Sequence, residues 1–336
     1  MPYLSVLRAK AVAVVSILLC AWTCACAEPI ATPIQISTQF HTGDRYMHVR
    51  LLGTVRLVNT PLHGFAASEL SGIAWDEDEQ VLYAVSDAGH LVHLRPQFDG
   101  DILSGTELVA TYPLLNENGT WLGKHLRDAE GLAIRKSANS TSGDSELLIS
   151  FEGKPRVSVY RPTGNYVGEE PLPKALRRKE DYAGTNSQLE AVTLHPVVGM
   201  ILAPQRRLKS SPKAIQGLYD AAGRVWTFPS LERHNCAIVG LETTPAGDVL
   251  VLERRYKNVF SPVVFAVRRV HLDPARQPDG GAVIAEDVMR MDNTEGWMVD
   301  NFEGIARHRE SHYFLVSDDN NSALQSTLLM YFEIIE

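Results

Sequence analysis

Three pieces of one stretch decide the fold: DAEGLA at residues 128–133, ELLISFE at 146–152 and RVSVYR at 156–161. The first piece places an acidic residue before a glycine, an aliphatic residue and a small residue. The other two have the Val-, Ile-, Tyr- and Phe-rich composition of β-strands separated by turns. The first piece recurs, and its copies are Ser71-Gly72-Ile73-Ala74, Glu190-Ala191-Val192-Thr193, Val239-Gly240-Leu241 and Glu303-Gly304-Ile305-Ala306. Self-similarity of this kind indicates a repeat architecture.

The repeat predicts an all-β fold, a β-propeller. Successive copies lie 49 to 64 residues apart, and each is followed by an apolar strand that ends in polar residues. At about 50 residues per four-stranded blade, the chain has room for about six blades. Only five copies are legible, so five blades are the alternative. Residues 48–58 and 328–336 are both strand-like and are expected to close the ring.

The first 27 residues have the composition of a signal peptide. Arg8 and Lys10 precede an apolar run at 11–19, and Ala25-Cys26-Ala27 supplies the small residues of a cleavage site. The run is too short to span a bilayer, so no integral membrane segment is expected after cleavage. We predict export to the periplasm or the medium. A lipoprotein is the less favoured alternative, because the residues before the three N-terminal cysteines fit that signal poorly.

The remaining chain, residues 46–336, shows no Gly- or Pro-rich linker and is interpreted as one domain. Only the polar segment around 172–180 is a candidate helix. The formal net charge of −8, without a basic stripe, argues against binding to nucleic acid. One cysteine, Cys236, follows the signal peptide, so no internal disulfide is expected. Oligomeric state has no sequence signal.

Rotational symmetry is the source of the site prediction. Equivalent positions of successive blades surround one axis, so Glu130, Glu190 and Glu303 are expected to meet there as catalytic residues. The residues at the ends of the following strands form a second equivalent set, which consists of Asp87, Glu152, Glu253, Asp318 and Asp319. Carboxylates that lie close together need a cation, arginines or shared protons.

The second set, without Asp87, is predicted to bind a divalent metal ion, calcium in the first place, because calcium prefers oxygen ligands. Arg156 and Arg254 follow strand ends and are expected to hold phosphate oxygens of a substrate, a task that suits guanidinium groups. The alternative is structural: such acidic residues can bind backbone amides or arginines of the adjacent blade.

Three blocks carry a resemblance to a known family. They are Ser71-Gly72-Ile73-Ala74-Trp75 with VLYAVSD (81–87), Asp128–Ala133 with LLISFEGKPRV (147–157), and Asp300–Ala306 with FLVSDDN (314–320) and LQSTLL (324–329). From about residue 46 to 336 the chain resembles the phytase-like family, exported bacterial proteins named for "esterase-like activity of phytase". The resemblance implies a propeller with phosphoesterase or esterase chemistry. Carried over by position, the residues that it implies are Glu130, Glu152, Glu190, Glu253, Glu303, Asp318 and Asp319.

Two copies depart from the acidic pattern. Ser71 stands where the first copy would carry glutamate, and Val239 stands there in the fourth. A fully symmetric ring of carboxylates is therefore not expected.

The favoured hypothesis is a metal-dependent hydrolase of small phosphorylated compounds, a phosphoesterase or esterase-like enzyme. No Gly-x-Ser-x-Gly, His-Glu-x-x-His or P-loop motif occurs in the chain. A non-catalytic propeller that binds a ligand or protein in the same cleft is the main alternative. A lactone hydrolase is the third, because metal-bound glutamates on propellers also suit lactone opening.

Overall fold

The structure is a computed structural model that describes residues 30–58, 61–62, 64–184, 187–232, 236–256, 261–272, 282–322 and 324–335. The predicted signal peptide, residues 1–27, lies outside these ranges.

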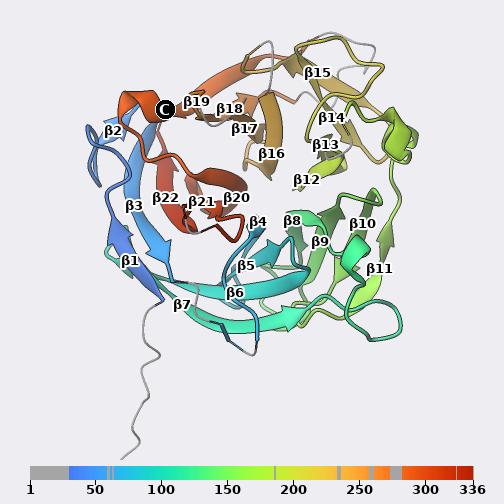
Figure 1. Cartoon of the computed structure of the whole chain (residues 1–336), viewed down its shortest axis with the longest axis horizontal. Coiled ribbons are helices and arrows are strands. Elements are labelled where there is room, and N and C mark those ends of the chain that lie inside the picture. The colour runs from blue at the N-terminus through green and yellow to red at the C-terminus, as the bar shows by residue number, and fades with distance from the viewer. Residues whose placement is uncertain are drawn as a thin grey trace, which may run out of the picture.

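Five antiparallel sheets surround a common axis, as Figure 1 shows. Blade 1 consists of β4 (Leu70–Asp76), β5 (Val81–Ser86), β6 (His90–Asp99) and β7 (Ile102–Pro113). Blade 2 consists of β8 (Ala129–Arg135), β9 (Glu146–Phe151), β10 (Arg156–Tyr160) and β11 (Tyr166–Glu170). Blade 3 consists of β12 (Leu189–His195), β13 (Gly199–Pro204), β14 (Ile215–Asp220) and β15 (Val225–Pro229).

Blade 4 consists of β16 (Cys236–Thr243), β17 (Val249–Arg255), β18 (Val264–Val270) and β19 (Ala285–Asp292). Blade 5 consists of β20 (Asn301–Arg309), β21 (His312–Asp318), β22 (Leu328–Ile334) and β3 (Val49–Leu57), with β1 (Ala31–Ile34) and β2 (Arg45–Tyr46) also paired to β3. Short 3₁₀ turns are η1 (Lys124–Leu126), η2 (Lys174–Leu176), η3 (Lys179–Asp181) and η4 (Asn293–Glu295). The segment considered for a helix, 172–180, contains only η2 and the start of η3.

The predicted β-propeller is confirmed, with the alternative count of five blades among the described residues. Strands β4, β8, β12, β16 and β20 lie innermost, and each contacts the innermost strands of the two neighbouring blades. The motif copies give the blade count directly, because each copy begins one innermost strand. Division by 50 residues overestimates it, since blade 1 has outer strands of 10 and 12 residues.

The two ends of the described chain close the ring within blade 5. Strand β3 pairs antiparallel with β22, and Leu329 lies opposite Val55. This pairing confirms the expectation that 48–58 and 328–336 close the propeller. It leaves no gap between blades, so all five innermost strands hold each other around the axis.

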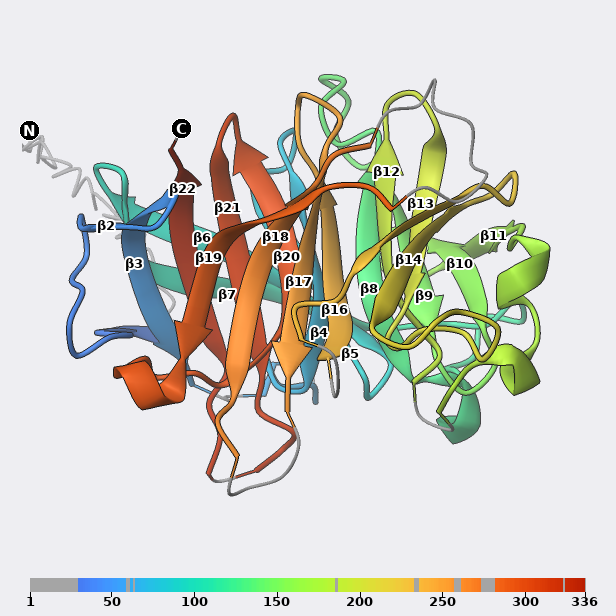
Figure 2. The ribbon, with the colours of Figure 1, turned by 90° about the horizontal axis from the view of Figure 1, so that it is seen from above.

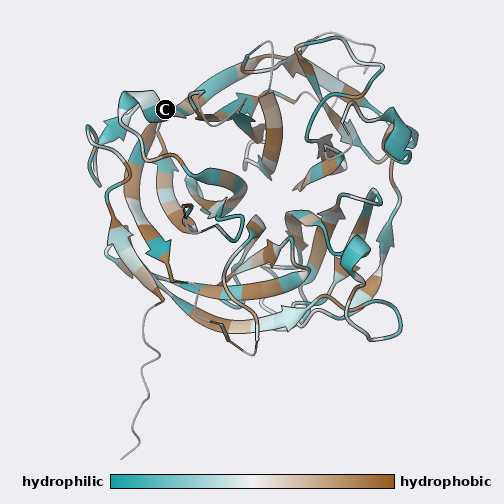
Figure 3. Cartoon of the chain, viewed as in Figure 1, coloured by the Kyte–Doolittle hydropathy of each residue, from teal (hydrophilic) through white to brown (hydrophobic). Residues whose placement is uncertain are grey.

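Both faces of most strands are buried, because each sheet packs against the next. All six residues of β5 are buried, and Figure 3 shows hydrophobic segments on the strands of every blade. This is why the strands have continuous apolar sequences instead of strict alternation. Cys236 is buried and free, as expected of a small hydrophobic residue, and burial raises the pKa of its thiol to about 11.

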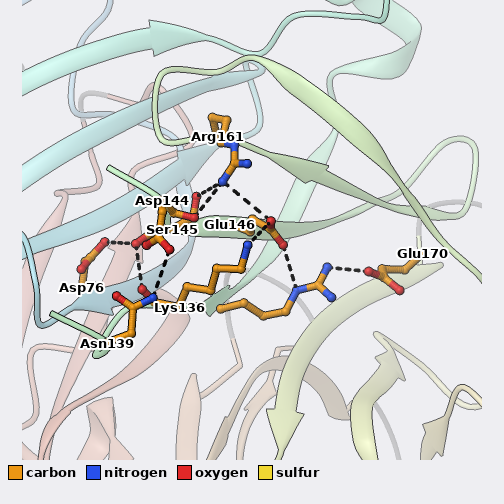
Figure 4. A network of polar contacts seen from close by, with 9 residues as sticks. Asp76, Lys136, Asn139, Asp144, Ser145, Glu146, Arg161 and Glu170 are labelled. Atoms are coloured by element: carbon orange, nitrogen blue, oxygen red, sulfur yellow. Dashed lines mark hydrogen bonds and ion pairs between the residues drawn. The ribbon is translucent and has the colours of Figure 1, made fainter. Parts of the chain in front are cut away.

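Polar contacts at a turn also connect blades 1 and 2 (Figure 4). Asp76, at the end of β4, accepts a hydrogen bond from the Ser145 hydroxyl at 2.6 Å. Beside it, the Glu146 carboxylate lies 2.8 Å from Nζ of Lys136 and 3.7 Å from Nη1 of Arg161. The turn of one blade is thus held to the loop of the next.

The strands run between two rims of turns and loops, which the side view of Figure 2 separates. We call the rim at which the innermost strands begin the acidic rim. The second strand of each blade ends at the same rim, because it is antiparallel to the first.

Candidate functional site

A β-bulge lies at the first residue of every motif copy. The pairing between the first and second strands shifts register between Leu70 and Gly72, Ala129 and Leu132, Leu189 and Ala191, Ile238 and Gly240, and Phe302 and Gly304. A bulge re-aims the side chain of the extra residue and is common beside active sites. The re-aimed residues form the inner ring, which consists of Ser71, Glu130, Glu190, Val239 and Glu303.

The motif glycines allow neighbouring copies to touch backbone to backbone. A Cβ atom would lie 2.6 Å from the Glu130 carbonyl oxygen on Gly72, 2.7 Å from that of Glu190 on Gly131, and 2.9 Å from that of Ser71 on Gly304. Real Cβ atoms do not approach so closely, so only glycine permits this packing. Copies far apart in the sequence are therefore direct neighbours, and the predicted rotational equivalence of the motifs is confirmed.

Strand register identifies a second ring. The residues opposite the last regular position before each bulge are Ser86, Phe151, Pro204, Glu253 and Ser317. Because side chains alternate between faces, the next residue of each strand shares the side of the bulged residue. The second ring therefore consists of Asp87, Glu152, Gln205, Arg254 and Asp318.

The register corrects the assignment of Glu253 to this set, because Arg254 occupies the equivalent position in blade 4. A slip of one residue places a side chain on the opposite face of the strand. The Glu253 carboxylate is fully buried within the blade, where it accepts hydrogen bonds from Nη1 of Arg268 at 2.7 Å and from the Leu231 amide at 3.2 Å. We therefore do not include Glu253 in the proposed metal site.

Three carboxylates converge in blade 2. One oxygen each of Asp128, Glu130 and Glu152 lies within 4.8 Å of the other two. Two oxygens bound to one calcium ion at about 2.4 Å are at most about 4.8 Å apart, so this spacing fits calcium. Asp128 was not among the predicted site residues. The signal for it is present in the sequence, because Asp128 precedes Glu130 by two residues and so belongs to the same side of the strand.

The acidic rim is electrostatically strained. Burial first, and then the proximity of Asp87 and Glu190, raises the pKa of Glu130 well above its usual value. Burial also raises the pKa values of Glu152 and Asp318, each to about 7, with Glu303 among the carboxylates that add to both. The two rings hold six carboxylates against one guanidinium, so the cluster favours a bound cation or shared protons.

Glu190 offers an unused ligand atom inside this cluster. Its side chain is 2% exposed, and Oε1 accepts a hydrogen bond from the Gln205 amide at 3.0 Å. Among the described residues, Oε2 has no hydrogen-bond partner. A buried oxygen without a partner costs free energy, and a cation, a water molecule or a substrate hydroxyl would remove that cost.

The guanidinium of the second ring reaches across to blade 5. Nη1 of Arg254 donates to Oε1 of Glu303 at 2.8 Å and also to the side-chain oxygen of Asn301. Asn301 in turn donates to Glu303 at 2.8 Å and to Asp318 at 3.2 Å. Arg254 and Glu303 line a cavity of about 830 Å³ between blades 4 and 5. The carboxylates, an arginine and an open pocket thus adjoin one another.

The blade 1 members of the rings also contact Glu303. The Ser71 hydroxyl hydrogen-bonds to the Asp87 carboxylate and lies 3.4 Å from Oε2 of Glu303. Serine at this position therefore replaces a further negative charge by a hydrogen-bond donor.

The remaining predicted residues have partners away from the pocket. Arg156 is 7% exposed, donates to the carbonyl oxygens of Leu126 at 2.6 Å and Lys154 at 3.2 Å, and lies 3.7 Å above the ring of Phe151. These contacts brace a loop, and a role in phosphate binding stays a prediction.

Asp319 accepts a hydrogen bond from the Glu69 amide at 3.1 Å and another from the Asn321 amide at 3.1 Å. These bonds tie the turn after β21 to the start of β4. A metal-binding role for Asp319 also stays a prediction.

A family model described as "Phytase-like: Esterase-like activity of phytase" matches residues 66–321. No curated protein sequence matches the chain. Two solved structures are similar. One is the extracellular domain of a protein described as a hybrid two component system from B. thetaiotaomicron, with 13% identity, a TM-score of 0.33 and coverage of 82% of this chain. This chain spans 30% of that protein's length.

The other is the β-propeller domain of Cps50 (Swd1) from Myceliophteria thermophila. Its identity is 11% and its TM-score is 0.38, with coverage of 91% of this chain and 99% of that one. Both likenesses are too remote to support any statement about function.

Proposed function

This chain belongs to the phytase-like family, and from that premise we propose that it is an exported, cation-assisted hydrolase of phosphate esters that works at the acidic rim. The family and the fold are those of a hydrolase-like propeller. The observation that carries the proposal is the position of the Arg254 guanidinium next to a cluster of carboxylates whose spacing fits a cation.

We assign the cation to Asp128, Glu130 and Glu152. Their oxygen donors, their spacing and the raised pKa values of the two glutamates all favour a hard divalent ion, with calcium first. A bound calcium ion would neutralise the cluster and polarise a phosphoryl oxygen. Asp318, in the second ring, is a further candidate ligand.

The residues of the chain have separate tasks in this proposal. Arg254 binds a phosphate oxygen of the substrate through a charge-assisted hydrogen bond. Glu303, held by Arg254 and Asn301, accepts a proton from the attacking water molecule. Glu190 Oε2 orients that water or a substrate hydroxyl, since it is buried and has no hydrogen-bond partner among the described residues.

The test is turnover of phosphomonoesters and phosphodiesters by the purified mature protein, with calcium and with chelator. We expect Glu303→Gln to abolish turnover while the melting temperature stays within a few degrees of the parent. Glu242→Gln is the matched control. Glu242 also lies on an innermost strand, but its carboxylate accepts the Thr243 and Arg307 amides at the opposite rim.

Unchanged turnover in Glu303→Gln would remove this residue from the mechanism. Absence of turnover in the parent, together with a large rise in melting temperature on adding calcium, would favour the ligand-binding alternative instead.

Export is a separate part of the proposal. It rests on the signal-like composition of residues 1–27, which lie outside the described ranges. Within the described ranges, no helix has the length and apolar character needed to cross a membrane. N-terminal sequencing of the mature protein tests the proposal, with Glu28 expected as the first residue.

A further inference from the structure

The cavity beside Arg254 has two chemically different walls. Its inner wall, toward the axis, carries Arg254, Asn301 and Glu303. Its outer wall is formed by loop residues and includes Tyr256 and Leu324. A ligand that reaches the carboxylates through this cavity therefore places one end on charged groups and the other on apolar ones.

The apolar wall is unusual for this surface. Ten large hydrophobic residues are exposed among the described residues, and three of them, Tyr256 at 44%, Met298 at 48% and Leu324 at 96%, line this one cavity. Val263 and Val299 complete the wall. Scattered exposed hydrophobic residues need no explanation, but apolar side chains gathered around one pocket mark a ligand site.

The charges at the outer wall argue against a substrate with several phosphates. Asp300 is the acidic member there, and its carboxylate already accepts the Ser326 and Asn301 amides at 2.7 and 3.0 Å. The one further guanidinium, that of Arg56, has Nη2 3.9 Å from the sulfur of Met298. A second phosphate would thus meet apolar side chains and a carboxylate, and would lose its hydration without a matched partner.

We infer that the substrate is an amphipathic phosphate ester, with one anionic head at Arg254 and an aryl or alkyl group against Tyr256, Met298 and Leu324. The inference rests on the proposed function for turnover, but not for binding. The cavity volume of about 830 Å³ exceeds that of a phenyl or short alkyl ester. Tyr256 offers a ring face for an aryl group.

Binding is tested first, with two non-hydrolysable compounds that share one head group. Phenylphosphonate and methylphosphonate are titrated calorimetrically into the calcium-loaded parent protein. We expect the phenyl compound to bind at least about tenfold more tightly, since each buried methylene-sized group contributes about fourfold. The phenyl compound should also show the more negative heat capacity change.

Met298→Ser and Leu324→Ser should each reduce that preference by about threefold or more, and together they should bring it close to one. Val197→Ser is the matched control, because Val197 is 72% exposed and lies in the β12–β13 turn at the opposite rim. Equal affinity of the two phosphonates in the parent protein would overturn the inference. So would a preference that survives both serine substitutions.

Turnover separates this inference from the proposed function. We expect the kcat/KM of phenyl phosphate and butyl phosphate to exceed that of glycerol phosphate by about tenfold. Equal turnover of all three would overturn the substrate class and leave the hydrolase standing. Selective phenylphosphonate binding without any turnover would do the reverse.

Discussion

Gly131→Ala tests the packing on which the site depends. The added methyl group would lie 2.7 Å from the Glu190 carbonyl oxygen and 2.8 Å from Cα of Ala191, in the next blade. Ordinary carbon–oxygen contacts are about 3.4 Å or longer, so the two innermost strands must separate by about 0.6 Å. In a closed ring of five blades, one gap cannot widen unless the others adjust.

The expected cost follows from two opposing effects. Overpacking a tight contact costs about 1 to 3 kcal/mol, and a contact between two backbones falls at the upper end because neither can rotate away. Replacing glycine by alanine also restricts the unfolded chain, which stabilises the fold by about 0.4 to 1 kcal/mol. The net expectation is a loss of about 2 kcal/mol in the free energy of unfolding.

Gly168→Ala is the matched control. Gly168 is also in a β-strand, in β11, but a Cβ there would meet no atom within 4 Å. This variant should therefore be neutral or slightly more stable. Urea unfolding of both variants gives the difference. Calcium titration of Gly131→Ala should also show weaker binding, because the substitution lies beside Glu130.

A loss in Gly131→Ala no larger than in Gly168→Ala would refute the reasoning. It would mean that the innermost strands can separate freely, and that glycine is not needed where the motif copies meet.

Three further outcomes are expected. Without calcium, the free energy of unfolding should fall as pH rises from about 5 to 8, since the raised pKa values of Glu152 and Asp318 let the folded chain keep protons that the unfolded chain has lost; calcium should abolish this fall, and a flat profile in chelator would contradict it. Glu253→Gln should cost about 3 kcal/mol in urea unfolding, because it breaks the buried pair with Arg268, yet leave calcium affinity unchanged; weaker calcium binding at unchanged stability would restore it as a ligand. Arg156→Ala should lower the melting temperature and leave the KM of a phosphate ester unchanged, whereas a tenfold higher KM at unchanged stability would assign it to substrate binding.

The blade architecture could be predicted because it is written as a local pattern. Each motif copy begins an innermost strand, and a strand sequence such as VLYAVS at 81–86 is apolar because both of its faces are buried. The closing strands were predictable for the same reason. The estimate of about six blades came from an average blade length, which long strands and loops in this chain exceed.

Neighbouring residues of one strand could not be distinguished without register. Glu253 and Arg254 both stand at a strand end, and only the pairing with β16 shows that Arg254 faces the cluster. A β-bulge changes the alternation by one residue, and nothing in the local composition marks where it falls. Asp128 was overlooked for a related reason, because its distance from Glu152 depends on how β8 and β9 pair.

What the sequence by itself determined is the repeat: an all-β ring, its approximate blade number, and three glutamates at equivalent positions. What only the tertiary structure decided is the neighbourhood of each charge. Burial beside Glu303 raises the pKa of Asp318, and loops from blades 4 and 5 place Leu324 near Arg254. Symmetry converts a repeated motif into a shared position, but dielectric surroundings and pocket walls arise from segments that are distant in the chain and carry no common pattern.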